Sequence, residues 1–286
     1  MNHFDADMII PTPVQTHDAQ CWAFMGAMGG AGVTSIAIQT AYSAMKALSA
    51  RAGAPGRVCL IDLDFEGGAV APYLDLIAGI KSEHLMGDAS RIDTDMASAF
   101  VCKHETGLHV LAAPNLLGGN DRVSPDCVLA LMDAASTLYD IIVLDIPRIW
   151  RPWTHAAIAA ADKFYLVTEL NIPALHITRK RARDIEMQAS LQDGVKIIIN
   201  KYERRILRSS LTVKDAAHAL EREIDHLICV HEDATRDAMN CGKPAGNLDA
   251  GGRFVKDVNA LTQNFLSLHE QGIAEYKRKL LKHSAA

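Results

Sequence analysis

The strongest constraint on the fold of this chain is the regular alternation of short apolar runs with longer stretches of helical character. Most of the apolar runs are hydrophobic at successive positions, which is typical of strands covered on both faces of a sheet. We expect strands at residues 21–25, 58–63, 108–113, 140–146, 163–170, 195–200 and 226–230. We expect helices at residues 34–50, 125–137, 154–161, 173–190, 211–222, 233–241 and 254–270. This order predicts an α/β fold with a single doubly wound, mainly parallel sheet flanked by helices.

The composition fits one globular domain. Of the 286 residues, 49% are hydrophobic, which is enough to fill a sizeable core. The net charge of −5 argues against general attraction to nucleic acid or anionic lipid. Residues 1–18 contain acids and prolines but no long apolar stretch, so they do not resemble a signal peptide. We expect a flexible segment at 1–18, the folded domain at 19–270 and a helical tail at 271–286.

The segment GAMGGAGVTS, residues 26–35, looks like a phosphate-binding loop that lacks its lysines. It follows the first predicted strand and leads into the first predicted helix. Glycines let consecutive backbone N–H groups surround an anion, and the start of a helix adds a partial positive charge. Thr34 takes the position at which a hydroxyl binds Mg²⁺ in the P-loop pattern. A plain tight connection between strand and helix is the alternative explanation.

Polar residues also follow other predicted strands. Ligands of doubly wound sheets bind beyond the carboxyl ends of the strands, so these positions are candidates for a site. Asp62 and Asp64 follow the second strand, and Asp145 follows the run DIIVL, where it can hold magnesium through a water. Asn200 follows VKIII and can both donate to and accept from a purine edge. Each aspartate alone is equally well explained as a helix cap, but their joint occurrence favours a nucleotide site.

These segments together resemble the MinD/ParA superfamily of deviant Walker A ATPases and, within it, the CpaE/TadZ branch linked to type IV pilus assembly. The resemblance covers residues 20–270 and rests on MGGAGVTS, CLIDLDFEGG followed by APYLDL, YDIIVLDIPRIW, ADKFYLVTELNIPALHITRKR, IIINKYERR and ICVHEDATRDAMNCGKPA. It implies that residues 19–270 form a P-loop nucleotide-binding domain with ATP and Mg²⁺ as cofactors. It also implies a homodimer, partners in a pilus secretion apparatus, and a cytoplasmic location that is polar or at the inner face of the membrane.

The resemblance further implies a role for individual residues. The phosphate loop would consist of Gly29, Gly30, Ala31, Gly32, Val33, Thr34 and Ser35. Asp64 would be the catalytic acid that orients water, and the magnesium site would use Thr34, Asp62 and Asp145. Asn200 would contact the adenine, with the backbone from Val230 to Glu232 beside the base.

This chain departs from the superfamily pattern K-G-G-x-G-K-T/S, because Met28 and Val33 stand where the two lysines would be. Loss of each lysine contact is expected to weaken nucleotide binding by about 1.5–3 kcal/mol. Hydrolysis should suffer more, by on the order of 10³-fold, because charge on the transferred phosphoryl group needs a positioned cation. Three cations lie just past strand ends: Arg148, Arg151 and Lys201. Arg148 is the best placed of them to contact the phosphates, and a plain exposed or ion-paired arginine is the alternative.

We therefore expect an ATP-binding CpaE/TadZ-like scaffold or switch with very slow or absent hydrolysis. The main alternative is an active ParA/MinD-type ATPase that positions cargo on DNA or membrane. The basic stretch TRKRARD, residues 178–184, and the tail AEYKRKLLKHSAA raise DNA and peripheral membrane contact as less favoured partners. Trp150 and Trp153 either line a dimer interface or pack within their own loop. A dinucleotide-dependent oxidoreductase fits least, because the glycine spacing does not match its fingerprint.

Overall fold

A computed structural model describes residues 19–189, 191, 193–203, 211–248 and 252–283, with the backbone alone described at 82, 120 and 268–283. Its sheet has eight strands in the order β3-β4-β2-β5-β1-β6-β7-β8. The strands are β1 (Gln20–Gly26), β2 (Val58–Asp62), β3 (Cys102–Lys103), β4 (His109–Leu111), β5 (Ile141–Ile146), β6 (Lys163–Glu169), β7 (Lys196–Tyr202) and β8 (His226–Cys229). Only β3 is antiparallel to its neighbour among these strands, so the sheet is mainly parallel as predicted.

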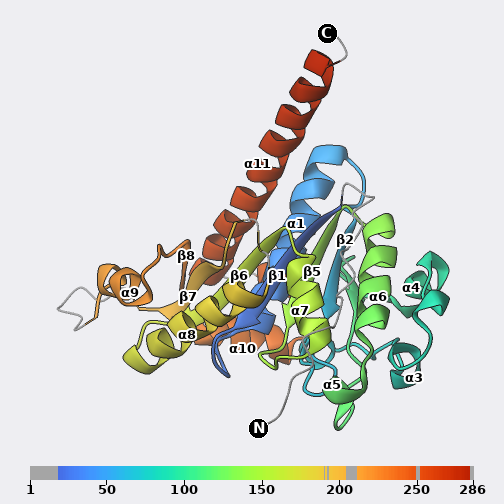
Figure 1. Ribbon diagram of the computed structural model, residues 1–286, viewed down its shortest axis with the longest axis horizontal. Coiled ribbons are helices and arrows are strands. Elements are labelled where there is room, and N and C mark those ends of the chain that lie inside the picture. The colour runs from blue at the N-terminus through green and yellow to red at the C-terminus, as the bar shows by residue number, and fades with distance from the viewer. Residues whose placement is uncertain (1–18, 190, 192, 204–210, 249–251, 284–286) are drawn as a thin grey trace.

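Helices cover both faces of the sheet (Figure 1). The longer ones are α1 (Val33–Ala52), α6 (Pro125–Leu138), α7 (Pro152–Ala159), α8 (Ile172–Gln188), α9 (Val213–Leu220), α10 (Glu232–Asn240) and α11 (Gly252–His283). The shorter ones are α2 (Val70–Tyr73), α3 (Ser82–Leu85), η1 (Ala89–Arg91), α4 (Thr94–Phe100), α5 (Gly119–Arg122) and η2 (Ala245–Asn247). One core cluster joins α1, α10 and α11 to the sheet, and another joins α4, α6, α7, α8 and α9 to the opposite face.

The central strand β1 explains why the apolar runs are continuous. Its alternate residues Ala23 and Met25 enter one core cluster, whereas Trp22 and Phe24 enter the other. All four side chains are fully buried. The ring of Trp22 also meets Phe265 of α11 edge to face, with ring centroids 4.8 Å apart. A strand that is buried on both faces has apolar side chains at successive positions. Its burial also fixes the position of the loop that follows it.

All seven predicted strands and all seven predicted helices are present, and their ends differ from the prediction by at most two residues, except at the carboxyl end of α11. Strand β3 and the short helices between residues 70 and 122 were not predicted. Helix α11 runs without a break through the predicted boundary at residue 270 and projects beyond the sheet (Figure 1). The division of the chain into segments stays a prediction, and the flexible segment predicted at 1–18 lies outside the described residues. No described helix is long and apolar enough to cross a membrane.

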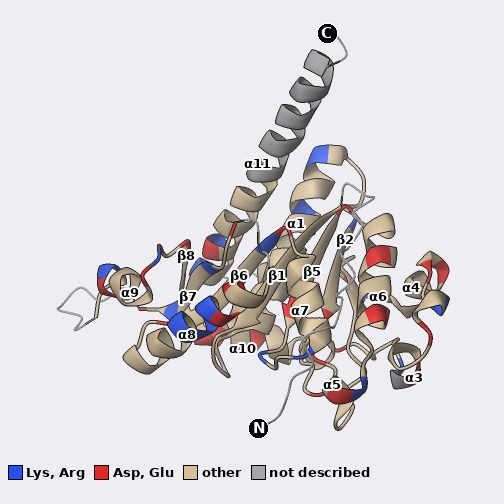
Figure 2. Ribbon diagram, viewed as in Figure 1, with Lys and Arg blue, Asp and Glu red and all other residues tan. Residues whose placement is uncertain are grey.

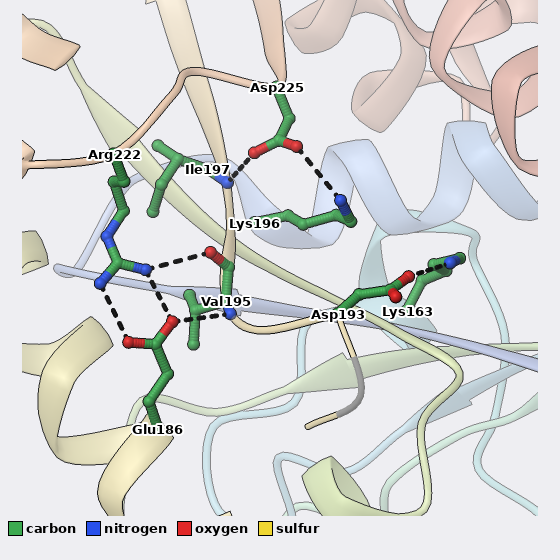
Figure 3. Close-up of polar contacts among 8 residues, drawn as sticks. All are labelled: Lys163, Glu186, Asp193, Val195, Lys196, Ile197, Arg222 and Asp225. Carbon is green, nitrogen blue, oxygen red and sulfur yellow. Dashed lines mark hydrogen bonds and ion pairs between the residues drawn. The ribbon is translucent and has the colours of Figure 1, made fainter. Parts of the chain in front are cut away.

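A charged network ties together the amino-terminal ends of β6, β7 and β8 (Figure 3). Arg222 donates to both carboxylate oxygens of Glu186, at 2.8 and 3.0 Å. Glu186 also accepts the N–H of Val195 at 3.0 Å, and Asp225 accepts the N–H of Ile197 at 2.7 Å. The other ion pairs drawn there are Lys163–Asp193 and Lys196–Asp225. The network therefore fastens the edge of the sheet opposite to the glycine-rich loop.

This network predicts a pH-dependent contribution to stability. The hydrogen bonds from Arg222 hold the pKa of Glu186 below its ordinary value of 4.5. The stabilisation by Glu186 is therefore present above that ordinary pKa and is lost as the pH falls through the lower pKa of the folded state. We expect Glu186→Gln to lower the free energy of unfolding by about 1 kcal/mol at pH 7, a modest value because the pair is partly exposed.

Urea unfolding of the wild type and Glu186→Gln at pH 7 and pH 3.5 checks this expectation. The difference in stability should shrink at the lower pH. Glu223→Gln is the matched control, because Glu223 is exposed in the same segment and forms no ion pair with another described residue. An equal loss in both variants, or a loss that does not depend on pH, would contradict this role.

Candidate nucleotide site

The loop between β1 and α1 follows the central strand of the sheet, where its glycines permit a left-handed backbone. Gly30 and Gly32 have φ angles of +76° and +84°, a region that favours glycine. Gly32 is the N-cap residue of α1, and no side chain caps the helix there. The first turn of α1 also contains no acidic residue. The start of α1 therefore presents its N–H groups and the positive end of its dipole to a ligand, as an anion site requires.

Close packing within this loop leaves no room for larger residues at two glycines. A Cβ on Gly26 would lie 2.9 Å from the carbonyl oxygen of Met28, and one on Gly32 would lie 2.4 Å from Nδ2 of Asn200. The side chains of Met28 and Val33 are half-buried and pack against one of the two core clusters. The two positions that carry lysine in the superfamily pattern are thus used here for apolar packing.

A hollow of about 300 Å³ opens beside the loop, at the carboxyl edge of the sheet. Its volume is at the lower end of the range for small-molecule sites. Nine of the predicted site residues line it: Gly30, Ala31, Gly32, Val33, Thr34, Ser35, Asp64, Asp145 and Arg148. Three residues that were not predicted, Gly67, Ala69 and Tyr73, line it from the segment that follows β2. The expectation that ligands bind beyond the carboxyl ends of strands indicates this segment. The hydrophobic periodicity of the sequence does not show that the segment turns back to line the hollow.

Thr34 and Asp145 meet across the hollow. The hydroxyl of Thr34 lies near enough to the carboxylate of Asp145 to affect its pKa. Burial raises the pKa of Asp145 to about 6, a rise that the Thr34 hydroxyl opposes and the carboxylate of Asp64 reinforces. A hydroxyl beside a carboxylate is an oxygen-donor pair that suits Mg²⁺ when phosphate oxygens and waters complete its octahedron. Among the described residues no group of three His, Cys, Asp or Glu side chains could hold a metal ion.

Asp62 lies behind this pair. It is buried, and its carboxylate accepts the N–H of Asp64 at 2.9 Å and the N–H of Val70 at 3.2 Å. Burial and the neighbouring carboxylate of Asp145 raise the pKa of Asp62 well above its ordinary value. Asp62 does not line the hollow, and it shapes the loop after β2 from within. Its part in a magnesium site therefore stays a prediction.

Asp64 faces the hollow from the loop that Asp62 shapes. Its side chain accepts the N–H of Gly67 at 2.9 Å and that of Glu66 at 3.3 Å, so the carboxylate is held by its own turn. This position beside the hollow is compatible with contact to a water or a phosphate. The catalytic role predicted for Asp64 is not tested by these contacts.

Arg148 is the only lysine or arginine among the described residues that line the hollow. Its guanidinium lies next to the phosphate loop, since a Cβ on Gly29 would be 3.9 Å from Cζ and Nε of Arg148. The other two cations considered from the sequence have partners: Arg151 pairs with Asp121, and Lys201 pairs with Glu169. Of these three cations, Arg148 is the one that lines the hollow.

Asn200 contacts the phosphate loop but does not line the hollow. It is buried, and its amide donates to the carbonyl of Ala31 at 2.8 Å. Val230 and Glu232 follow β8 at the same edge of the sheet, but neither lines the hollow. The N–H of Val230 instead donates to the carbonyl of Tyr202 at 3.1 Å. Contact of these three residues with a base stays a prediction.

The basic stretch of α8 and the tryptophan after β5 both make contacts within the domain. The basic residues of α8 follow one another closely along the helix (Figure 2). Arg179 and Arg183 both pair with Glu221, and Arg181 donates to the carbonyl of Arg148 at 2.7 Å. Much of the stretch is therefore neutralised or engaged. Trp153 is almost fully buried and packs edge to face on Phe65, so it packs within the domain.

Known proteins are similar to this chain in sequence or in fold. The septum site-determining protein MinD of Thermotoga maritima is 25% identical over 213 residues, which cover 72% of this chain and 76% of that protein. A ParA family ATPase from Chlorobium tepidum TLS superposes with a TM-score of 0.70 at 19% identity and covers 86% of this chain and 98% of its own. MinD of Pyrococcus horikoshii OT3, complexed with Mg-ADP, superposes with a TM-score of 0.68 at 15% identity, over 86% and 96% of the two chains. No family model matches the sequence.

The structural likenesses, at these identities, show the fold, and the MinD match adds a similarity in sequence. The motifs quoted from the sequence lie at matching places in the structure. They are the loop after β1 and the acids at the ends of β2 and β5. Together, these comparisons show that the chain has the fold of MinD and ParA proteins and a sequence similarity to MinD.

Proposed function

We propose that this chain binds ATP with Mg²⁺ and acts as a nucleotide-dependent dimeric scaffold or switch that hydrolyses ATP very slowly or not at all. The observation that carries the proposal is the start of α1. It is capped by the left-handed Gly32 without a side-chain cap, and it opens onto a hollow where Thr34 and Asp145 meet. Backbone N–H groups and a divalent ion can hold a polyphosphate without a lysine.

The residues present fit a nucleotide and a magnesium ion. The loop from Gly29 to Ser35 would surround the phosphates, and Thr34 with Asp145 would hold the ion, directly or through water. When bound, the ion neutralises charge on the phosphate oxygens. The complexes of Pyrococcus horikoshii MinD with Mg-ADP and of a Cyanothece McdA variant with ATP, which share this fold, support the choice of ligand.

Slow hydrolysis follows from the charges around the hollow. Charge that develops on the transferred phosphoryl group needs positioned cations, and Arg148 is the only one that the described lining supplies. Met28 and Val33, at the positions of the two lysines, are apolar and pack against the core, so they supply no cation there. Nucleotide exchange and dimerisation, in place of rapid turnover, would then set the state of the protein.

A partner role extends this proposal. The motif resemblance to the CpaE/TadZ branch favours protein partners in a pilus secretion apparatus, which would read the nucleotide state of a homodimer at the cytoplasmic face. The MinC:MinD cell division complex of Aquifex aeolicus, which shares this fold with a TM-score of 0.64, supports the idea that such a domain binds a second protein. The competing function is an ATPase that positions cargo on DNA or membrane, and its sign would be turnover stimulated by either surface.

Calorimetry and a phosphate-release assay test the proposal together. We expect Mg·ATP to bind with measurable heat, EDTA to weaken binding, and phosphate release to stay near the uncatalysed rate with or without DNA or lipid vesicles. Val33→Lys restores the lysine of the pattern, and we expect it to tighten Mg·ATP binding by about tenfold. Sedimentation with and without Mg·ATP reads the dimer.

Two results would overturn this proposal. Absence of any heat and of any rise in melting temperature with millimolar Mg·ATP would exclude nucleotide binding. Rapid phosphate release by the wild type would exclude a slow switch and favour the ATPase that positions cargo.

The position of Arg148 generates a separate prediction. Since its guanidinium lies beside Gly29 and lines the hollow, we expect Arg148→Ala to weaken ATP binding by about tenfold, or about 1.4 kcal/mol. Calorimetry checks this value. Arg57→Ala, which removes an exposed arginine beside Asp140 at the other end of the sheet, is the control and should leave affinity unchanged. An unchanged affinity in Arg148→Ala would rule out its contact with the phosphates.

A further inference from the structure

Two side chains at the end of strand β7 donate hydrogen bonds to the backbone of the phosphate loop. The amide of Asn200 donates to the carbonyl of Ala31 at 2.8 Å, and the ammonium group of Lys201 donates to the carbonyl of Gly30 at 2.8 Å. Two consecutive side chains of one strand thus bind two consecutive carbonyls of the loop. Lys201 is one of the three cations that the sequence puts just past a strand end, and its ammonium group engages the backbone of the loop.

A bulge in β7 makes this double contact possible. Successive side chains of a regular strand point to opposite faces, so Asn200 and Lys201 would normally diverge. Lys201 has a φ angle of +53°, and the register with β8 shifts between Ile199 and Tyr202. Such an extra residue turns the strand and re-aims a side chain. The left-handed backbone at Lys201 is uncommon for a residue with a side chain, and here it directs the ammonium group to the loop.

Glu169 at the end of β6 fixes the ammonium group of Lys201. Its Oε1 lies 2.8 Å from Nζ of Lys201, and the backbones of Glu169 and Asn200 are paired in register. The Lys201 side chain is 42% exposed and that of Glu169 is 25% exposed, so water screens the pair in part. A lysine held at both a carboxylate and a carbonyl has fewer rotamers than a free one, which keeps its charge next to Gly30.

The geometry of a trans peptide links these carbonyls to the hollow. Among the described residues no peptide bond is cis, so C=O and N–H of one unit point in opposite directions. The carbonyls of Gly30 and Ala31 point toward β7, and the N–H groups of Ala31 and Gly32 therefore point away from it. Both of these residues line the hollow. A donor on the carbonyl also polarises its peptide unit, which strengthens the N–H on the other side.

We propose that Lys201 is a positioning residue for the polyphosphate and supplies, through the Gly30–Ala31 peptide, part of the charge that the absent loop lysines would supply directly. This inference rests on the proposed nucleotide function and deepens it. The ammonium group acts on the N–H groups that receive the phosphates and does not contact the ligand. Asn200 holds the adjacent peptide in the same orientation without a charge.

The test compares Lys201→Met with the wild type in calorimetric titrations of Mg·ADP and of AMP. We expect the dissociation constant for Mg·ADP to rise by about tenfold, because the lost hydrogen bond carries a charge but is partly exposed. We expect AMP to be weakened less, since it has one phosphate for the loop to bind. Lys201→Arg, which can still donate to the Gly30 carbonyl, should restore most of the affinity. Lys46→Met, at an exposed lysine of α1, is the control for a change in net charge.

The outcomes separate this inference from the function on which it rests. If the wild type binds no Mg·ADP, the nucleotide function fails and the role of Lys201 fails with it. If the wild type binds and Lys201→Met binds equally well, the nucleotide function stands and the role of Lys201 is wrong. An equal loss for Mg·ADP and AMP would show a general structural role and would also overturn it. Should Lys201→Met not fold, Lys201→Gln is measured under the same criteria, because it removes the charge and keeps a donor.

Discussion

The site depends on the left-handed turn at Gly32, which ends the loop after β1 and begins α1 without a side-chain cap. A Ser, Thr or Asp at this position would bind the first N–H groups of the helix itself. Glycine leaves them to a ligand, and its missing Cβ also lets Asn200 reach the backbone of Ala31. The buried strand β1 fixes where this turn starts, because its side chains are locked into the core on both faces.

The loops that follow β2, β4 and β5 pack against one another beside the hollow. The rings of Phe65, after β2, and Trp153, after β5, meet edge to face with centroids 5.2 Å apart. The N–H of Leu116 donates to the carbonyl of Phe65 at 2.8 Å, and Asp121 pairs with Arg151. The segment after β4 thus contacts both loops that border the site. A ligand that moves one of these loops would have to move its neighbours, which is the property required of a nucleotide-dependent switch.

The fold could be predicted from the sequence because strands that are buried on both faces appear as runs of consecutive apolar residues. That pattern marks all seven parallel strands, and Pro152 and Pro173 mark the starts of α7 and α8. Strand β3 was missed because it has two residues, Cys102 and Lys103, at the edge of the sheet. The four-residue helices were missed because four residues are too few for a helical pattern of apolar positions to be recognised.

The candidate site was predicted in part, for reasons that lie in the geometry. The loop residues from Gly30 to Ser35 and the acids Asp64 and Asp145 line one hollow, as strand-end placement indicates, whereas Gly29 does not line it. The strand-end rule cannot distinguish Asp62, which points into the protein, from Asp64, which faces the hollow. The contact of Lys201 with Gly30 depends on a bulge and a positive φ angle, and neither has a signature in the residues IIINK.

The central claim is that backbone N–H groups of the loop from Gly29 to Ser35 hold the phosphates without a lysine. The most direct measurement is the NMR spectrum of protein labelled with ¹⁵N-glycine, recorded during titration with Mg·ADP. The amide signals of Gly29, Gly30 and Gly32 should shift markedly on binding, whereas that of Gly53, at the far end of α1, should stay in place. If calorimetry shows saturation by Mg·ADP while the three loop signals do not move, the ligand binds elsewhere and the account is wrong.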